Sequence, residues 1–183
     1  MSNNYWEDVY QSKQPEQVSW YQQQAEKTLE LIRSQNLSLD AELIDVGSGA
    51  SQLIDQLIEA GYENLHVLDL SETALKTTHA RLIDKGLDTH HIQWQVADIC
   101  TVELEAQRFD LWHDRAVFHF MVKEEQQAQY LQNVRHALKP NGVLIISTFA
   151  EDGPTQCSGL PVERYSVEKL VQRLGEGFKL IEY

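Results

Sequence analysis

Cysteine is scarce in this chain of 183 residues, and so are basic side chains and long apolar runs. The two cysteines, Cys100 and Cys157, lack the spacing of a metal-binding motif, so we expect reduced thiols and no metal centre. No run approaches the ~18 apolar residues of a membrane span. The polar start MSNNYWEDVYQSKQ is unlike a signal peptide. These features favour a cytoplasmic protein with no membrane partner.

Positive charge is also limited, because 15 Lys and Arg residues face 28 Asp and Glu residues, giving a formal net charge of −13. A surface of this sign repels phosphates, so we expect no nucleic-acid partner. The composition is otherwise ordinary, with 42% hydrophobic and 23% charged residues. A chain of this length most simply forms one domain with a real core.

Apolar segments alternate between two periodicities along the chain. Short runs typical of buried strands lie at residues 41–47, 65–71, 91–98, 109–114, 142–150 and 178–183. Segments with helical spacing lie between them, at residues 51–61, 72–86, 130–138 and 166–175. Strands joined by crossover helices run parallel, so the sequence predicts an α/β fold with a doubly wound, mostly parallel sheet and helices on both faces.

The segment before the first strand is helical in pattern and rich in aromatics: Tyr5, Trp6, Tyr10, Trp20 and Tyr21. One interpretation is that these side chains pack on the sheet as ordinary core. The other is a lid over the carboxyl edge of the sheet, where doubly wound folds bind ligands. We expect a single domain over residues 1–183, with a helical lid segment at 1–40 and the α/β core at 41–183.

The stretch LIDVGSGAS, residues 43–51, ends the first strand with an acid and two glycines. Gly47 and Gly49 permit tight curvature and close approach of a ligand to the backbone. A dinucleotide fingerprint would place a third glycine where Gln52 stands, so the match to a pyrophosphate site is partial. Asp45 would repel a phosphate and suits a cationic group. An NAD-dependent oxidoreductase is therefore disfavoured.

Two further acids end the next two strands. Asp69 closes HVLD and can accept both hydroxyls of a ribose. Asp98 in QVADI can accept the exocyclic amine of adenine, while the N–H of Ile99 reaches a ring nitrogen. The alternative is coincidence, because surface carboxylates are common. Together the three acids describe a ligand with an adenosine, no phosphate and a positively charged end.

S-adenosylmethionine is a ligand of this kind, with an adenosine, no phosphate and a positively charged end. Residues 43–150 resemble the class I S-adenosylmethionine-dependent methyltransferases. Five segments carry the resemblance in order: LIDVGSGAS, HVLDLS, VADI, FDLWHDRAVFHF and ALKPNGVLIISTF. The longer strings VSWYQ, WHDRAVFHFM and CSGLPVERY resemble one bacterial branch that has no settled substrate. The resemblance implies a Rossmann-like fold, S-adenosyl-L-methionine as cofactor, and methyl transfer to a small-molecule or protein acceptor.

The resemblance also assigns roles to residues of this chain. Those implied to hold the methionine end are Asp45, Gly47, Ser48 and Gly49. Those implied to bind the adenosine are Asp69, Leu70, Asp98 and Ile99. The stretch from His113 to Arg115 would lie beside the sulfonium and the departing methyl group. Trp20 would contribute to the roof of the site.

Methyl transfer depends mostly on alignment and desolvation, and a base is needed only if the acceptor must first lose a proton. The nearby catalytic candidates are His113, Asp114 and His119. A histidine in an apolar stretch such as VFHFM is more often a core residue. Asp114 is better suited to orient the cofactor or to pair with Arg115 than to abstract a proton.

The segment at residues 151–165 is too long for a simple connector, and its position predicts substrate contact through Arg164 and Tyr165. A solvated loop with a structural salt bridge is an equal alternative. Class I methyltransferases typically close with a seventh strand, which we expect this chain to lack because it ends at Tyr183. Either the chain is shortened or the protein has no closing hairpin. An open apolar edge at residues 142–150 would then favour self-association.

Two functions remain open at this point. The first is an active methyltransferase. The second is a module that binds S-adenosylmethionine without turnover, because the incomplete sheet and the lack of an obvious base leave catalysis open.

Overall fold

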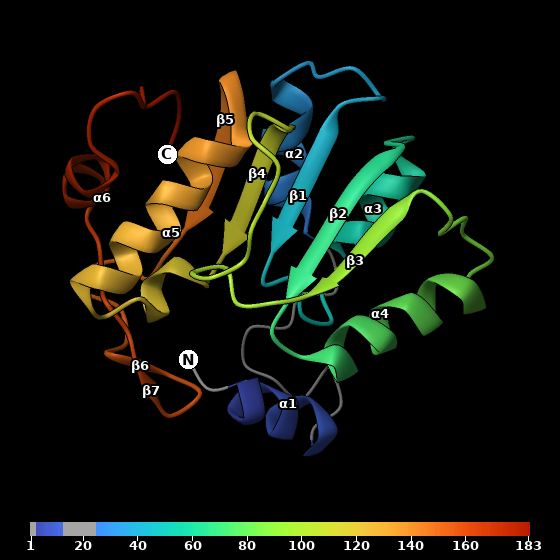
Figure 1. Cartoon of the computed structure of the whole chain (residues 1–183), viewed down its shortest axis with the longest axis horizontal. Helices are drawn as coiled ribbons and strands as arrows, with labels where there is room; N and C mark the ends of the chain where they lie inside the picture. The colour runs from blue at the N-terminus through green and yellow to red at the C-terminus, as the bar shows by residue number, and fades with distance from the viewer. Residues whose placement is uncertain (1–2, 13–24) are drawn as a thin grey trace.

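The computed structural model describes residues 3–12 and 25–183 and is built around a five-stranded sheet (Figure 1). The strands are β1 (Glu42–Val46), β2 (Asn64–Asp69), β3 (Ile92–Val96), β4 (Phe109–Arg115) and β5 (Leu138–Ser147). They lie in the order β3-β2-β1-β4-β5, and every neighbouring pair is parallel. The prediction of a doubly wound parallel sheet is confirmed.

Helices cover both faces of this sheet. One face packs against α2 (Glu26–Ser34), α3 (Leu53–Glu59) and α4 (Glu72–Asp84). The other face packs against α5 (Glu124–Ala137) and α6 (Val167–Leu174). None of the described helices is long and apolar enough to cross a bilayer.

The central strands are apolar on both sides because both sides are covered. On β1, Leu43 packs with the α2 and α3 side, whereas Ile44 packs with the α5 side. A strand in this position reads as a continuous apolar run rather than an alternating one. On the α5 side, the fully buried Trp112 donates its indole N–H to the hydroxyl of Tyr130 at 3.0 Å.

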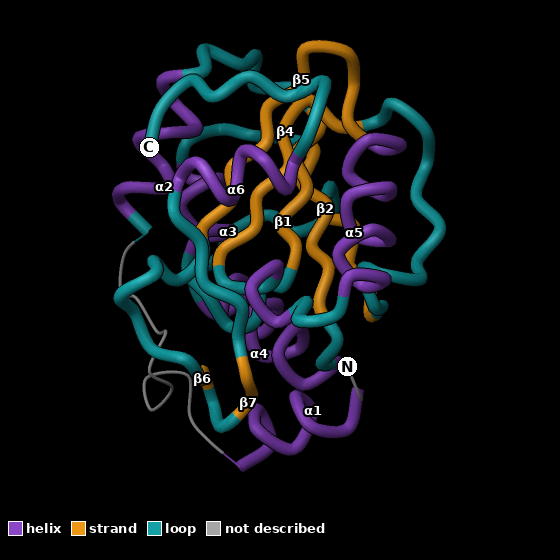
Figure 2. Tube along the Cα trace, turned by 90° about the vertical axis from the view of Figure 1, so that its left-hand side faces the viewer, coloured by secondary structure: helices purple, strands orange, loops and turns teal. Residues whose placement is uncertain are grey.

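The strand order reverses between β1 and β4. The chain moves outward from β1 through β2 to β3, then returns to β4 along residues 97–108, which form neither helix nor strand. Loops that leave β1 and β4 toward opposite faces open a crevice at the carboxyl ends of these strands. At this end of the sheet lie the helix α1 (Asn3–Ser12) and a small hairpin of β6 (Gln156–Cys157) and β7 (Leu160–Pro161) (Figures 1 and 2).

The prediction of a sixth strand at residues 178–183 is wrong. This segment has no strand structure, and β5 pairs with β4 alone among the described residues. Ile181 and Tyr183 are exposed, and Glu182 forms an exposed ion pair with Lys27 of α2 at 3.4 Å. An apolar hexapeptide has strand propensity, but a strand forms only where a partner edge takes up its backbone hydrogen bonds.

Candidate functional site

A cavity lies at the carboxyl ends of the strands, at the point where the strand order reverses. The described residues that line it include Gly47, Asp69, Leu70, Asp98 and Ile99, all singled out from the sequence. The glycine loop after β1, the acid that ends β2 and the segment after β3 therefore surround one space.

Two positions of the glycine loop require glycine, because their backbone conformation is left-handed and because a Cβ atom there would collide with a neighbouring side chain. Gly47 and Gly49 have φ angles of 66° and 56°, in the left-handed region. A Cβ atom on Gly47 would lie 2.0 Å from Cγ2 of Val117, and one on Gly49 would lie 2.3 Å from the hydroxyl of Tyr10. Neither position therefore has room for a side chain, and Gly47 belongs to the described lining of the cavity.

Asp69 presents a buried carboxylate to the cavity. Its two oxygens accept the N–H groups of Gly49 and Ser71, each at 2.8 Å. Burial raises the pKa of Asp69 from 3.8 to about 6, although these two hydrogen bonds oppose the shift. Each carboxylate oxygen still has a lone pair for a further donor, so the group can accept two hydroxyls.

The segment after β3 is held in a fixed position. Asp98 accepts the N–H of Cys100 at 2.9 Å through its side chain. The carbonyl of Ile99 accepts the side-chain amide of Asn133 at 2.6 Å, and Ile99 is buried. This arrangement holds a carboxylate and a backbone edge at the cavity, as recognition of a planar heterocycle requires.

Asp45 and His113 form a buried pair beside the cavity. His113 Nδ1 lies 2.6 Å from Asp45 Oδ1, and both residues are 5% exposed. Asp45 Oδ2 and His113 Nε2 are buried, and no described residue forms a hydrogen bond with either atom. Neither residue belongs to the described lining of the cavity. Ser48, between Gly47 and Gly49 in the glycine loop, is also buried and lies outside that lining. Their contact with a methionine group stays a prediction.

Asp114 organises the turn after β4. It is fully buried, and its carboxylate accepts the N–H groups of Val117 at 2.9 Å and Phe118 at 3.0 Å and the hydroxyl of Tyr130 at 2.5 Å. Burial raises the pKa of Asp114 to about 6, against the hydrogen bond from Tyr130. These contacts account for the carboxylate within the fold, and the structure does not bring Asp114 to the described cavity lining.

His119 lies on the short helix η2 (Phe118–Phe120) and is fully buried. Its ring packs against Phe120 and Phe149 with centroids 4.4 and 4.8 Å apart, and neither ring nitrogen has a hydrogen-bond partner within residues 3–12 and 25–183. Desolvation lowers the pKa of His119 to about 4, so the ring is neutral at pH 7. Its position is that of a core histidine, and a role as base stays a prediction.

Arg164 and Tyr165 order the segment after β5. Arg164 donates to the carbonyls of Glu151 at 2.6 Å and Gly153 at 3.0 Å. Tyr165 is 4% exposed, and its ring stacks on Phe118 with centroids 5.6 Å apart. Neither residue belongs to the described lining of the cavity, and their role in substrate binding stays a prediction.

Some residues of the lining carried no assignment from the sequence: Trp6, Tyr10, Phe120 and Cys157. Trp6 meets Phe120 edge to face with ring centroids 5.1 Å apart. The aromatic-rich start of the chain was the signal for Trp6 and Tyr10. Phe120 and Cys157 lie in the strings WHDRAVFHFM and CSGLPVERY, but neither residue was assigned to the site, since their place depends on how distant segments fold together. Trp20, the roof residue expected instead, lies outside the described residues.

Glu7 fastens α1 to the beginning of α4. Its carboxylate accepts the hydroxyl of Ser71 at 2.7 Å, the N–H of Thr73 at 3.2 Å and the hydroxyl of Thr73. Hydrogen bonds from Thr73 and Ser71 lower the pKa of Glu7 to about 2. α1 therefore contributes to the cavity wall, whereas α2 packs into the sheet core. A lid function for residues 1–40 stays a prediction.

The strand order and the site together define the class I methyltransferase fold, with its glycine loop and strand-end acids at one cavity. Residues 43–142 match the family described as methyltransferase domain, and the chain belongs to that family.

Two relatives are similar in sequence to most of this chain. A zebrafish (Danio rerio) protein named EEF1A lysine methyltransferase 2 is 27% identical over 168 residues, which cover 88% of this chain and 65% of that protein. The human (Homo sapiens) protein of the same name is 22% identical over 169 residues, which cover 89% of this chain and 65% of that protein. The chain thus spans 65% of the length of each.

Solved structures share the fold. One described for the conversion of a disulfide bond into a thioacetal group during echinomycin biosynthesis has a TM-score of 0.73 and 19% identity, covering 96% of this chain and 78% of that one. The Burkholderia thailandensis 1,6-didemethyltoxoflavin-N1-methyltransferase, with S-adenosylhomocysteine bound, has a TM-score of 0.66 and 20% identity. The match covers 82% of this chain and 64% of that one.

Proposed function

We propose that this chain binds S-adenosylmethionine in the cavity at the ends of β1, β2 and β4 and transfers its methyl group to an acceptor. The observation that carries the proposal is the single cavity at which Gly47, Asp69 and Asp98 meet. Two carboxylates at the lining and a glycine with no room for a Cβ fit an adenosine that bears no phosphate. The bound cofactor would supply an electrophilic methyl group on a positively charged sulfur.

The chain's own contribution is binding, orientation and exclusion of water. The Asp69 carboxylate accepts hydrogen bonds from the ribose hydroxyls. The Asp98 carboxylate accepts one from the exocyclic amine of the adenine, and the N–H of Ile99 donates one to a ring nitrogen. Trp6 and Phe120 supply apolar walls at the cavity. Alignment and desolvation provide most of the acceleration of an in-line displacement.

A protein lysine is the first acceptor to test. Two relatives are named as EEF1A lysine methyltransferases, and the net charge of −13 attracts a basic partner. A small molecule is the second, supported by the fold shared with the 1,6-didemethyltoxoflavin-N1-methyltransferase. A binding module without turnover remains the third, since His113, Asp114 and His119 all lie outside the described lining.

Transfer of a labelled methyl group separates these three functions. The chain is incubated with methyl-labelled S-adenosylmethionine and either lysine-rich proteins, EEF1A among them, or a panel of small metabolites. We expect label on a protein lysine. Label confined to the metabolites would identify a small acceptor, and cofactor binding without any label would leave only the binding module. Cell fractionation tests the cytoplasmic location that the sequence leads us to expect.

Cofactor affinity should rise with pH through about 6, the pKa of Asp69. Ribose hydroxyls donate to the ionised carboxylate, so binding favours the charged form and lowers this pKa. Affinity should therefore be constant above the free-state pKa and fall by up to about tenfold for each pH unit below it. Titration calorimetry of S-adenosylhomocysteine from pH 5 to 8 measures the slope. Asp69→Asn should remove it, and an equal slope in that variant would assign it to another group.

Self-association should increase with concentration, because β5 pairs with β4 alone among the described residues. Val143, Leu144 and Ile146 on this strand are only half-buried, and an unpaired apolar edge accepts another strand. Val143→Lys should reduce association measured by light scattering, while Val171→Lys on α6 should not. A monomer at high concentration for the unaltered chain would contradict the open-edge hypothesis.

A further inference from the structure

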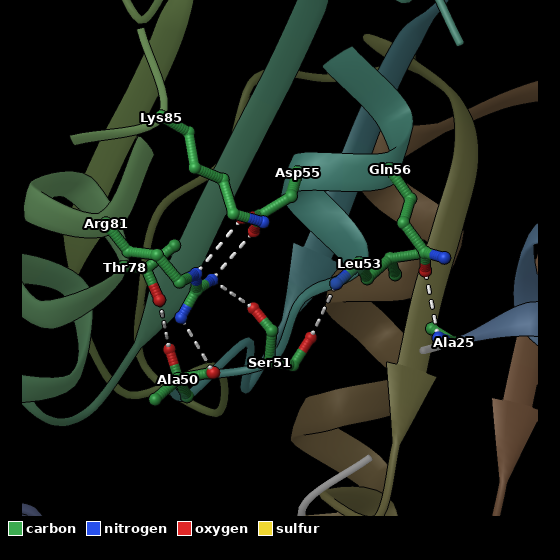
Figure 3. A network of polar contacts seen from close by, with 10 residues as sticks. Ala25, Ala50, Ser51, Leu53, Asp55, Gln56, Thr78, Arg81 and Lys85 are labelled. Carbon is green, nitrogen blue, oxygen red and sulfur yellow. Dashed lines mark hydrogen bonds and ion pairs between the residues drawn. The ribbon is translucent and has the colours of Figure 1, made fainter. Parts of the chain in front are cut away.

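Side chains of α4 hold three successive carbonyls of the glycine loop (Figure 3). Thr78 donates its hydroxyl to the carbonyl of Gly49 at 3.2 Å. The guanidinium of Arg81 donates through Nη1 to the carbonyl of Ala50 at 3.1 Å and through Nη2 to that of Ser51 at 2.6 Å. The loop is therefore tied along its carbonyl side to a helix that follows the next strand.

Arg81 is itself held in place by Asp55 of α3 (Figure 3). Nε and Nη2 of Arg81 donate to the two oxygens of Asp55 at 3.1 and 2.8 Å, and Lys85 donates to the same carboxylate at 2.8 Å. The side chain of Asp55 is 1% exposed. Burial alone would raise the pKa of Asp55, but hydrogen bonds from Arg81 and Lys85 outweigh it and keep the pKa below its usual value. A bidentate pair of this kind fixes the plane of the guanidinium.

The same loop carries ligand-facing groups on its other side. The N–H of Gly49 donates to Asp69 at 2.8 Å, and Gly47 lines the cavity. The peptide groups around Gly49 are thus held from both directions, by Thr78 through the carbonyl and by Asp69 through the N–H. Arg81 does not belong to the described lining, so any effect on a ligand must pass through the loop.

We propose that Arg81 is a positioning residue for the cofactor site. Anchored by Asp55, its guanidinium sets the direction of the Ala50 and Ser51 peptides and so the placement of the Gly49 N–H against Asp69. This inference rests on the proposed function, because cofactor affinity is one of its two readouts. Arg81 takes no part in the chemistry.

The first readout compares Arg81→Lys with Lys85→Met. A lysine keeps a positive charge beside Asp55, but a single ammonium cannot reproduce the fork that spans Asp55 and two carbonyls. Arg81→Lys should weaken binding of S-adenosylhomocysteine by about tenfold, with little change in the urea midpoint of unfolding. Lys85→Met removes the other cation on Asp55 without touching the loop and should leave binding unchanged. Equal affinities for Arg81→Lys and the unaltered chain would overturn the proposal, as would equal losses in both variants.

The second readout needs no cofactor. With ¹⁵N-labelled glycine, the amide of Gly49 reports directly on its hydrogen bond to Asp69. Its hydrogen exchange in the ligand-free protein should be faster in Arg81→Lys than in the unaltered chain and unchanged in Lys85→Met. This result supports the positioning role even if the unaltered chain fails to bind S-adenosylhomocysteine, in which case the proposed function fails separately. Identical Gly49 exchange in all three proteins overturns the inference.

Discussion

Replacing Asp69 by alanine should weaken binding of S-adenosylhomocysteine by about 2–4 kcal/mol, or roughly 30- to 700-fold. The reason is that two charge-assisted hydrogen bonds to the ribose would be lost from a site where Asp69 is 7% exposed. Isothermal titration calorimetry measures the dissociation constant directly.

Two comparisons make this result specific to the site. Asp69→Asn keeps the shape and one acceptor oxygen, so its affinity should fall between those of the alanine variant and the unaltered chain. Asp88→Ala removes an exposed carboxylate from the loop after α4 and should not change binding. Urea unfolding is measured alongside, since Gly49 and Ser71 lose their acceptor. An unchanged dissociation constant for Asp69→Ala would remove Asp69 from the site.

Replacing Asp114 by alanine should lower the free energy of unfolding by about 3 kcal/mol or more, because three donors in a buried position would lose their acceptor. Those donors are the N–H groups of Val117 and Phe118 and the hydroxyl of Tyr130. Tyr130→Phe removes one of these three hydrogen bonds and also the acceptor of the Trp112 indole N–H, and it should cost less, about 2 kcal/mol. Urea unfolding monitored by tryptophan fluorescence measures both effects. An Asp114→Ala variant with normal stability and no turnover would instead favour the catalytic role considered from the sequence.

The sheet could be predicted because its local and global preferences agree. Apolar runs that end at Asp45 and Asp69 are buried on both faces, and such strands read continuously apolar. The helix predicted at residues 72–86 agrees with α4 (Glu72–Asp84), which in the structure is capped by Ser71, whose hydroxyl accepts the N–H of Ala74. The expected strand at residues 178–183 failed because its apolar pattern says nothing about whether a partner edge is available.

The cofactor side of the site was visible in the sequence for a geometric reason. Parallel strands bring their carboxyl ends to one edge, so Gly47, Asp69 and Asp98 meet although they are far apart in the chain. The roles of Arg81 and Asp114 were hidden, because each depends on hydrogen bonds to backbone groups whose direction only the folded chain defines.

We propose that the cavity at the glycine loop binds an adenosine without phosphate. Calorimetric titration of the chain with S-adenosylmethionine, S-adenosylhomocysteine and NAD tests it most directly. We expect one binding site per chain for the first two ligands and no binding of NAD. Binding of NAD in preference to S-adenosylhomocysteine, or binding of none of the three, would contradict it.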